Sequence, residues 1–245
     1  MSEAHERRTQ ALKDALAAEG LVPQDPFPCP YLPGRTARQA FVRPRAFLPG
    51  LYHAFLDLNF RRLGRLVYRA ACEGCRECRS LRVVVDEFRP TRAQRRCLAR
   101  NADVTVEVGP PAVTDEKLAL YRRYLERRHD GQMSGTREEF EQFLYDAPPL
   151  AKELVYRVGG RLLGAGIADF EPRALSAVYF YFDPDEAARS PGVFNVLSLV
   201  AECQRGGLPW LYLGYYVAGS PRMAYKARYR PHETMDDDFR WQRSR

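Results

Sequence analysis

Residues 154–182 read LVYRVGGRLLGAGIADFEPRALSAVYFYF, and this stretch decides the fold. Three apolar and aromatic runs, 154–158, 162–170 and 175–182, are separated by Gly159-Gly160 and by Glu171–Arg173. Short turns between apolar runs of this kind are typical of hairpins. The stretch therefore predicts three successive strands.

The segments that follow complete an α+β pattern. Ser190 and Pro191 suit the N-cap and the first position of a helix that runs to about Gln204. A strand over 210–217 and a short helix around 223–227 come next. This order is similar to the N-acetyltransferase (GNAT-type) fold, a mixed sheet with flanking helices. Fold order alone is weak evidence for chemistry.

The first part of the chain has a different composition, rich in cysteine and arginine. We expect a loosely docked helix over 3–19 and a smaller α/β region after it. Pro110-Pro111 is the best candidate for a boundary. We therefore expect a Cys/Arg-rich N-terminal domain over 1–109 and a GNAT-like C-terminal domain over 110–245.

Positive charge is concentrated in one segment. The whole chain carries a net charge of +7, whereas residues 35–100 hold 16 Arg, no Lys and five acids, a net +11. Arginine pairs bidentately with phosphate and stacks on bases, so the segment suggests a polyanionic partner. An arginine-rich surface without a partner is the alternative. A helix capped by Thr91 would expose four arginines, Arg92, Arg95, Arg96 and Arg100.

No run approaches the ~18 uninterrupted apolar residues of a transmembrane helix. The N-terminus, MSEAHERRTQ, is charged and lacks the apolar run of a signal peptide. We expect a soluble cytoplasmic protein with no membrane partner.

The residues at the start of the expected helix after Ser190 indicate whether the protein could bind coenzyme A. Acetyltransferases that use this cofactor hold its pyrophosphate on the backbone amides of a glycine-rich loop at this helix N-terminus. Here Phe194 stands where a small residue is needed, and Pro191 supplies no amide. The segment argues against coenzyme A, whereas an acyl group carried on tRNA suits both the fold and the basic segment.

Six motifs between residues 29 and 233 resemble one family. They are CPYLPGR (29–35), NFRRLG (59–64, similar to the family's NGFRRSG, with Leu63 replacing Ser), CEGCRECRSLRV (72–83), FRPTRAQRR (88–96), SAVYFYFDP (176–184), and LYLGYY (211–216) with MAYKAR (223–228). They resemble the bacterial branch of the arginyl-tRNA–protein transferases, the aspartate/glutamate leucyltransferases. The resemblance implies transfer of leucine from leucyl-tRNA to proteins that begin with Asp or Glu, which marks them for degradation through the N-degron route.

Two alternatives stay open: an arginyltransferase with the same acceptors, and a non-catalytic RNA-binding protein that holds a metal. The transfer reaction joins an α-amine to an ester that is already activated. It requires orientation, a proton acceptor and oxyanion stabilisation, and no cofactor. No Ser-His-Asp or Cys-His arrangement is evident among the four His.

Several residues are candidates for this chemistry. Arg61, Arg62 and Arg82 suit the acceptor's carboxylate, because arginine binds carboxylates bidentately. Asp169 could receive the proton of the α-ammonium group. The alternatives are phosphate binding or a solvent-facing position for each arginine, and a turn position for Asp169.

The last motifs supply candidates for the donor side. Lys226 could contact the oxyanion or the tRNA 3′ end, and Tyr215 is a further catalytic candidate. Tyr179, Tyr216 and Tyr225 could bind substrate, since aromatic rings stack on adenine. Core packing is the alternative, and alternation along a strand makes one of Tyr215 and Tyr216 face the core.

Four of the six cysteines could share one site. Cys72, Cys75 and Cys78, with the distant Cys29, offer the four thiolates of a zinc ion or an iron–sulfur cluster. Eukaryotic relatives are reported to hold a cluster through N-terminal cysteines, so the resemblance supports this interpretation. Reduced cysteines that pack the loop are the alternative.

Overall fold

The decisive stretch forms three consecutive antiparallel strands in the computed structural model, which describes residues 3–128 and 135–244. These strands are β8 (Ala151–Val158), β9 (Arg161–Glu171) and β10 (Ala174–Phe182). The prediction from residues 154–182 is confirmed, and each strand is longer than its apolar run.

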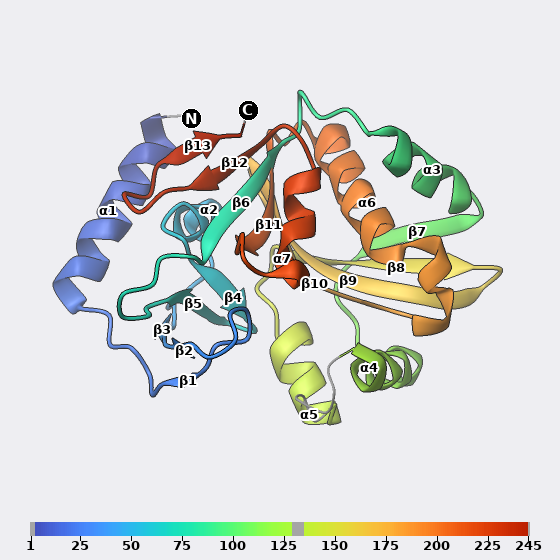
Figure 1. Cartoon of the computed structure of the whole chain (residues 1–245), viewed down its shortest axis with the longest axis horizontal. Helices are drawn as coiled ribbons and strands as arrows, with labels where there is room; N and C mark the ends of the chain where they lie inside the picture. Colours follow the sequence, from blue (N-terminus) through green and yellow to red (C-terminus); the bar gives the residue numbers. More distant parts are fainter. Residues whose placement is uncertain (1–2, 129–134, 245) are drawn as a thin grey trace.

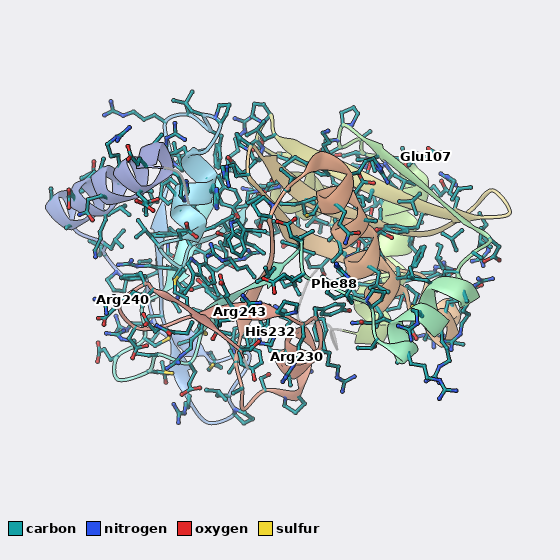
Figure 2. All side chains as sticks on the ribbon, turned by 90° about the horizontal axis from the view of Figure 1, so that it is seen from above. Phe88, Glu107, Arg230, His232, Arg240 and Arg243 are labelled. Carbon is teal, nitrogen blue, oxygen red and sulfur yellow. The ribbon has the colours of Figure 1, made fainter. Side chains whose placement is uncertain are left out.

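These strands belong to a mixed sheet of eight strands, in the order β13-β12-β6-β11-β10-β9-β8-β7. Neighbours are antiparallel except β10 and β11, which are parallel. Arg243 and Glu107 mark the two edge strands in Figure 2. The other strands are β6 (Arg79–Val84), β7 (Val104–Gly109), β11 (Trp210–Tyr216), β12 (His232–Met235) and β13 (Trp241–Arg243).

Helices cover both faces of this sheet (Figure 1). On one face, α6 (Pro191–Gly206) packs on the strands and α3 (Arg92–Arg100) packs on α6. On the other face lie α4 (Asp115–Arg128), α5 (Arg137–Phe140) and the π-turn η1 (Glu141–Tyr145). Shorter helices are η2 (Pro184–Arg189), α7 (Pro221–Ala224) and η3 (Tyr225–Arg228). The predicted α+β mixed sheet with flanking helices is confirmed.

The N-terminal part docks beside the sheet (Figure 1). A three-stranded sheet has the order β3-β5-β4, and β1 pairs with β2. Its core includes Tyr212 of β11 and Ala174 of β10, so the two parts share buried surface. Its elements are α1 (Glu3–Glu19), β1 (Phe27–Pro28), β2 (Thr36–Ala37), β3 (Gln39–Val42), α2 (Leu51–Leu56), β4 (Arg61–Leu63) and β5 (Leu66–Ala70).

Some boundaries differ from the expected ones. The proposed boundary at residue 110 falls between β7 and α4, but β6 and β7 precede it and pair within the large sheet. Two strands of the expected first domain thus belong to the sheet of the second. Ser190 lies before α6 as expected, but η2 leads directly into it, so Ser190 takes a left-handed conformation (φ 57°) without a side-chain cap bond.

The two parallel strands of the sheet, β10 and β11, separate after a short stretch of pairing. β10 and β11 pair only at Ala174–Ser176 and Trp210–Tyr212. Register shifts follow at Ala177/Tyr179 on β10 and at Tyr212/Gly214 on β11. We call this separation, after Ser176 and Tyr212, the splay. Nowhere in the described ranges is a helix long and apolar enough to cross a membrane.

Candidate functional site

Arg61 reaches from β4 into the splay. Its Nη1 donates to Ser176 Oγ at 3.1 Å and its Nη2 to the Ala177 carbonyl at 2.5 Å. On the β11 side it lies against Gly214, where a Cβ atom would stand 3.1 Å from Arg61 Nε. Gly214 also has φ +81°, which glycine adopts without cost. The side chain of Arg61 therefore occupies the point where the strands part.

Lys226 of η3 lies close to Arg61, at the β11 side of the splay. It is 7% exposed, and its Nζ donates to the Tyr215 carbonyl at 2.6 Å. Burial, and then the positive charge of Arg61, lower the pKa of Lys226 from 10.5 to about 7. Within residues 3–128 and 135–244, neither Arg61 nor Lys226 pairs with a carboxylate. We call Arg61, Ser176, Tyr215 and Lys226 the splay site.

Tyr215 ties the splay site to the N-terminal part. Its hydroxyl donates to the Asn59 carbonyl at 3.0 Å and accepts from the Ala70 amide at 3.2 Å. Tyr216 points to the opposite face and packs against the α6 core. The expectation that one of the two faces the core is confirmed for Tyr216, whereas Tyr215 is buried against the N-terminal part.

The other predicted aromatic residues lie on β10 and η3. Tyr225, next to Lys226, is 41% exposed. Tyr179 packs edge-to-face on Tyr121 of α4, and no partner is found for its buried hydroxyl in the part of the chain that the structure describes. Tyr225 is therefore the more accessible of the two.

Arg62 and Asp169 pair with each other. Arg62 Nε and Nη2 donate to the two Asp169 oxygens at 2.7 and 2.8 Å. Their side chains are 0% and 1% exposed. Direct contact with substrate stays a prediction for both residues, and in this structure they contact each other.

Arg82 lies in a separate buried group. Its Nε donates to Glu233 at 2.8 Å, and its Nη1 donates to the Tyr212 hydroxyl at 3.0 Å and to Asp57 at 3.4 Å. Asp57 also accepts from Tyr212 and from two further donors. We call the set the Asp57 cluster: His5, His53, Asp57, Arg82, Tyr212, Glu233 and Trp241.

The Asp57 cluster includes three possible metal ligands. The ligand atoms of His5, His53 and Asp57 lie within 4.8 Å of one another, the closest such group in the described residues. His5 already bonds to Asp57 at 2.8 Å, and His53 bonds to Tyr212 at 3.0 Å. Burial, the largest effect, lowers the pKa of His53 to about 4. Protein groups satisfy these side chains, so we assign no ion here.

The four predicted cysteines surround one cavity. Cys29, Cys72, Cys75 and Cys78 line a space of about 30 Å³ together with Tyr215. The Arg38 amide donates to Cys72 Sγ at 3.4 Å and Arg35 donates to Cys75 Sγ at 3.6 Å. Burial, followed by the three other cysteines, raises the pKa of Cys78 to about 12. Thiols gathered in this way are suited to a positive ion, which reverses the repulsion between thiolates.

The arginines of α3 form an exposed face, as predicted. Arg95 donates to the Pro90 carbonyl at 2.6 Å, and Arg100 donates to the Ala188 carbonyl. Arg92 and Arg96 are exposed as well. The helix is held by a capping box between Thr91 and Gln94, so the predicted cap is confirmed.

The structure thus brings Arg61, Lys226 and Tyr215 together and places Arg82 elsewhere. Sequence reasoning missed Ser176, Gly214 and Asp57 as site residues. Gly214 carried a signal, because a glycine inside a strand marks a bulge or a close approach. No sequence pattern marks Asp57, because its partners come from distant segments.

Comparison with known proteins covers most of the chain. Residues 27–96 match the family described as arginine-tRNA-protein transferase, N terminus, and residues 116–236 match the corresponding C terminus. An aspartate/glutamate leucyltransferase of Halorhodospira halophila is 42% identical over 213 residues, 85% of this chain and 90% of the relative. One of Pseudomonas savastanoi is 41% identical over 219 residues, 88% of this chain and 93% of the relative.

Among solved structures, the fold is similar to the C-terminal domain (DUF2156) of a protein described as a lysylphosphatidylglycerol synthetase of Agrobacterium fabrum. The TM-score is 0.51 at 16% identity, covering 80% of this chain and 63% of that one. This likeness concerns the fold alone.

Proposed function

This chain belongs to the arginine-tRNA-protein transferase family, and we propose that it moves leucine from leucyl-tRNA to the N-terminal Asp or Glu of proteins. One observation carries the assignment of the site. Two buried basic side chains, Arg61, which is charged, and Lys226, meet at the splay with no carboxylate partner in the described ranges. Burying charge without a partner is costly, so such a site is suited to an anionic ligand.

Arg61 is the proposed reader of the acceptor. An N-terminal Asp or Glu carries a side-chain carboxylate, which a guanidinium binds strongly. Of the three predicted arginines, Arg62 and Arg82 already pair with acids of the protein. Among the described residues, Arg61 bonds to a hydroxyl and a carbonyl. The incoming carboxylate would replace these weaker contacts.

Lys226 is the proposed proton acceptor. With a pKa of about 7, a large fraction of Lys226 is neutral at neutral pH. The neutral amine takes a proton from the acceptor's α-ammonium group. The freed amine attacks the ester carbonyl carbon, the new C–N bond forms, and the C–O bond to the ribose breaks. Lys226 then returns its proton to the departing ribose oxygen, and the second proton, which the attacking nitrogen loses as it becomes an amide, is released to solvent.

The donor is proposed to enter from the η3 side. Tyr225 is exposed next to Lys226 and is proposed to stack on the terminal adenine. The other two candidates lie on the strands of the splay: Tyr179 on β10, and Tyr216 on β11, where it packs against the α6 core. The exposed arginines of α3 are proposed to contact the tRNA backbone, which would make binding salt-dependent.

The four cysteines are proposed to hold an iron–sulfur cluster or zinc, outside the transfer step. The four thiols line one cavity, and this donor set fits either a tetrahedral zinc ion or an iron–sulfur cluster. Metal and sulfide analysis of protein purified without oxygen, with Cys78→Ser as the control, tests this.

Leucine as the transferred residue rests on the relatives. A transfer assay with leucyl-tRNA and arginyl-tRNA side by side, and peptides that begin with Asp, Glu or Lys, decides it. We expect leucylated Asp and Glu peptides and an unmodified Lys peptide. Transfer from arginyl-tRNA alone would make the enzyme an arginyltransferase, and RNA binding without transfer would support the non-catalytic alternative. We further propose that the protein acts in the cytoplasm, where charged tRNA is available, and marks its products for degradation.

A further inference from the structure

We propose that Arg62 and Asp169 are a positioning pair, which aims the neighbouring Arg61 at the acceptor's carboxylate. The inference rests on the proposed function and assigns these two residues a role distinct from substrate contact or proton transfer. It is carried by one observation: two consecutive arginines bind two residues that are paired on neighbouring strands.

Asp169 and Ser176 are direct partners on β9 and β10. Residues opposite each other on adjacent strands project from the same face of the sheet. Arg61 donates a hydrogen bond to Ser176, and Arg62 donates to Asp169. Consecutive residues of a strand normally point to opposite sides. Nevertheless, both arginines of the short strand β4 reach this single pair of residues.

The Arg62–Asp169 contact is the rigid half of this arrangement. Both Asp169 oxygens accept from Arg62, and Arg62 Nη1 donates to the Gly64 carbonyl at 3.0 Å. Planar bidentate contacts of this kind fix direction as well as distance. Tyr52 of α2, fully buried, is close to both arginines. All three nitrogens of the Arg62 guanidinium therefore donate to the protein, which fixes its direction and with it the backbone of β4.

Arg61 is the adjustable half. Its partners are a hydroxyl and a backbone carbonyl rather than an acid, and its guanidinium lies against Gly214, where any side chain would crowd it. Its direction thus depends on the backbone that Arg62 holds. Asp169 itself is 1% exposed with both oxygens occupied, so it has no free oxygen to accept a proton from substrate.

Asp169→Asn is the first test, with steady-state transfer to Asp-, Asn- and Ala-initial peptides. We expect the KM for the Asp peptide to rise about 10-fold, since small misplacements of a binding group cost this much or more. The preference for Asp over Asn and Ala should fall with it. At saturating acceptor, kcat and its pH dependence should stay within about 3-fold, because Lys226 is untouched.

Asp169→Asn leaves Arg62 buried without its charge partner and lowers Tm, so a second variant separates aim from stability. In Arg62→Met/Asp169→Leu an apolar pair replaces the ion pair, which often preserves stability. We expect Tm to recover while the raised KM and the weakened preference persist.

Two results would overturn the inference: a double variant that recovers the wild-type KM, or an Asp169→Asn enzyme that loses kcat together with a limb of its pH profile. The second would make Asp169 a proton acceptor. Failure of the wild-type protein to leucylate any acidic peptide would instead refute the proposed function, so the two failures are distinguishable.

Discussion

Two tyrosines three residues apart on β11 have contrasting surroundings. Tyr212 donates to Asp57 at 2.5 Å and accepts from Arg82, so it joins a buried acid to a buried base. Tyr215 bonds to backbone groups only, beside Arg61 and Lys226, which lack an acid throughout the described part of the chain. The Asp57 cluster holds acids as well as bases, whereas the splay site has two basic side chains and no acid among the described residues.

The difference indicates which region holds the fold together and which one binds a ligand. Removing one partner of a buried ion pair strongly destabilises a protein, because the other charge stays buried. The Asp57 cluster should respond in this way. In the described structure the basic side chains of the splay site have no acid partner, so changing them should alter transfer more than stability.

The largest expected effect is on Lys226. Lys226→Ala should lower kcat about 1,000-fold, since a positioned general base contributes 10²–10⁴-fold. The chain offers a matched control in Lys117, which is similarly buried but pairs with Glu153. Lys117→Met should lower Tm and leave the kinetics intact at a temperature where it is folded. A Lys226→Ala enzyme with near-normal turnover would remove Lys226 from the mechanism.

The same residue sets the expected pH dependence. Because the pKa of Lys226 is lowered from 10.5 to about 7, kcat should rise with pH up to about 7 and then level off. Lys226→Ala should lack this limb. Between pH 7 and 10.5 the unfolded state binds the extra proton, so wild-type stability should increase with pH relative to Lys226→Met. Equal slopes for the two proteins in thermal melts would mean that Lys226 is not buried in its neutral form.

On the other side of the comparison, Asp57→Asn should destabilise the protein by about 3 kcal/mol. Asp57 accepts from four side chains, including buried Arg82, which would be left with Glu233 as its acid partner. Trp241→Phe removes one donor and should cost about 1 kcal/mol. Urea unfolding measures both changes. If Asp57→Asn abolished transfer without loss of stability, the Asp57 cluster would be part of the active site.

Arg61→Gln should lower kcat/KM for an Asp peptide about 100-fold, because the acceptor's carboxylate loses its charged partner. An Ala peptide, already poor, should change little, so the preference for Asp disappears. Arg61→Lys keeps the charge without the fork and should be intermediate. Competition assays with Asp and Ala peptides measure this. An unchanged preference would locate the reader of the acceptor elsewhere.

The sequence could predict the parts of this comparison that depend on local pattern. The strands of residues 154–182 follow from apolar runs between glycine-containing turns, and Thr91 with Gln94 is a local capping box. The C-terminal hairpin of β12 and β13 was missed, because its strands have four and three residues and surround an acidic turn. Short strands take their stability from neighbours and carry little pattern of their own.

The site could be predicted only by residue type. Arg61, Arg62 and Arg82 are chemically identical, and what separates them is the presence or absence of an acid from another segment. Arg62 finds Asp169, 107 residues away, and Arg82 finds Glu233, 151 residues away. No local pattern records these pairings, so the sequence alone could not single out Arg61.

The smallest expected effect concerns the tRNA face. Arg92→Ala and Arg96→Ala on α3 should each weaken tRNA binding about 2- to 5-fold and reduce the slope of log K against log salt by about 0.9 per lost phosphate contact. Arg240 is the matched control, exposed on the loop between β12 and β13 and far from α3 (Figures 1 and 2). Arg240→Ala should leave both quantities unchanged, because a localised phosphate contact depends on position as well as charge. Filter binding of leucyl-tRNA at several salt concentrations compares the three variants. Equal losses for all three would mean that net charge alone attracts tRNA, and α3 would then have no special part in holding the donor whose ester reaches Lys226.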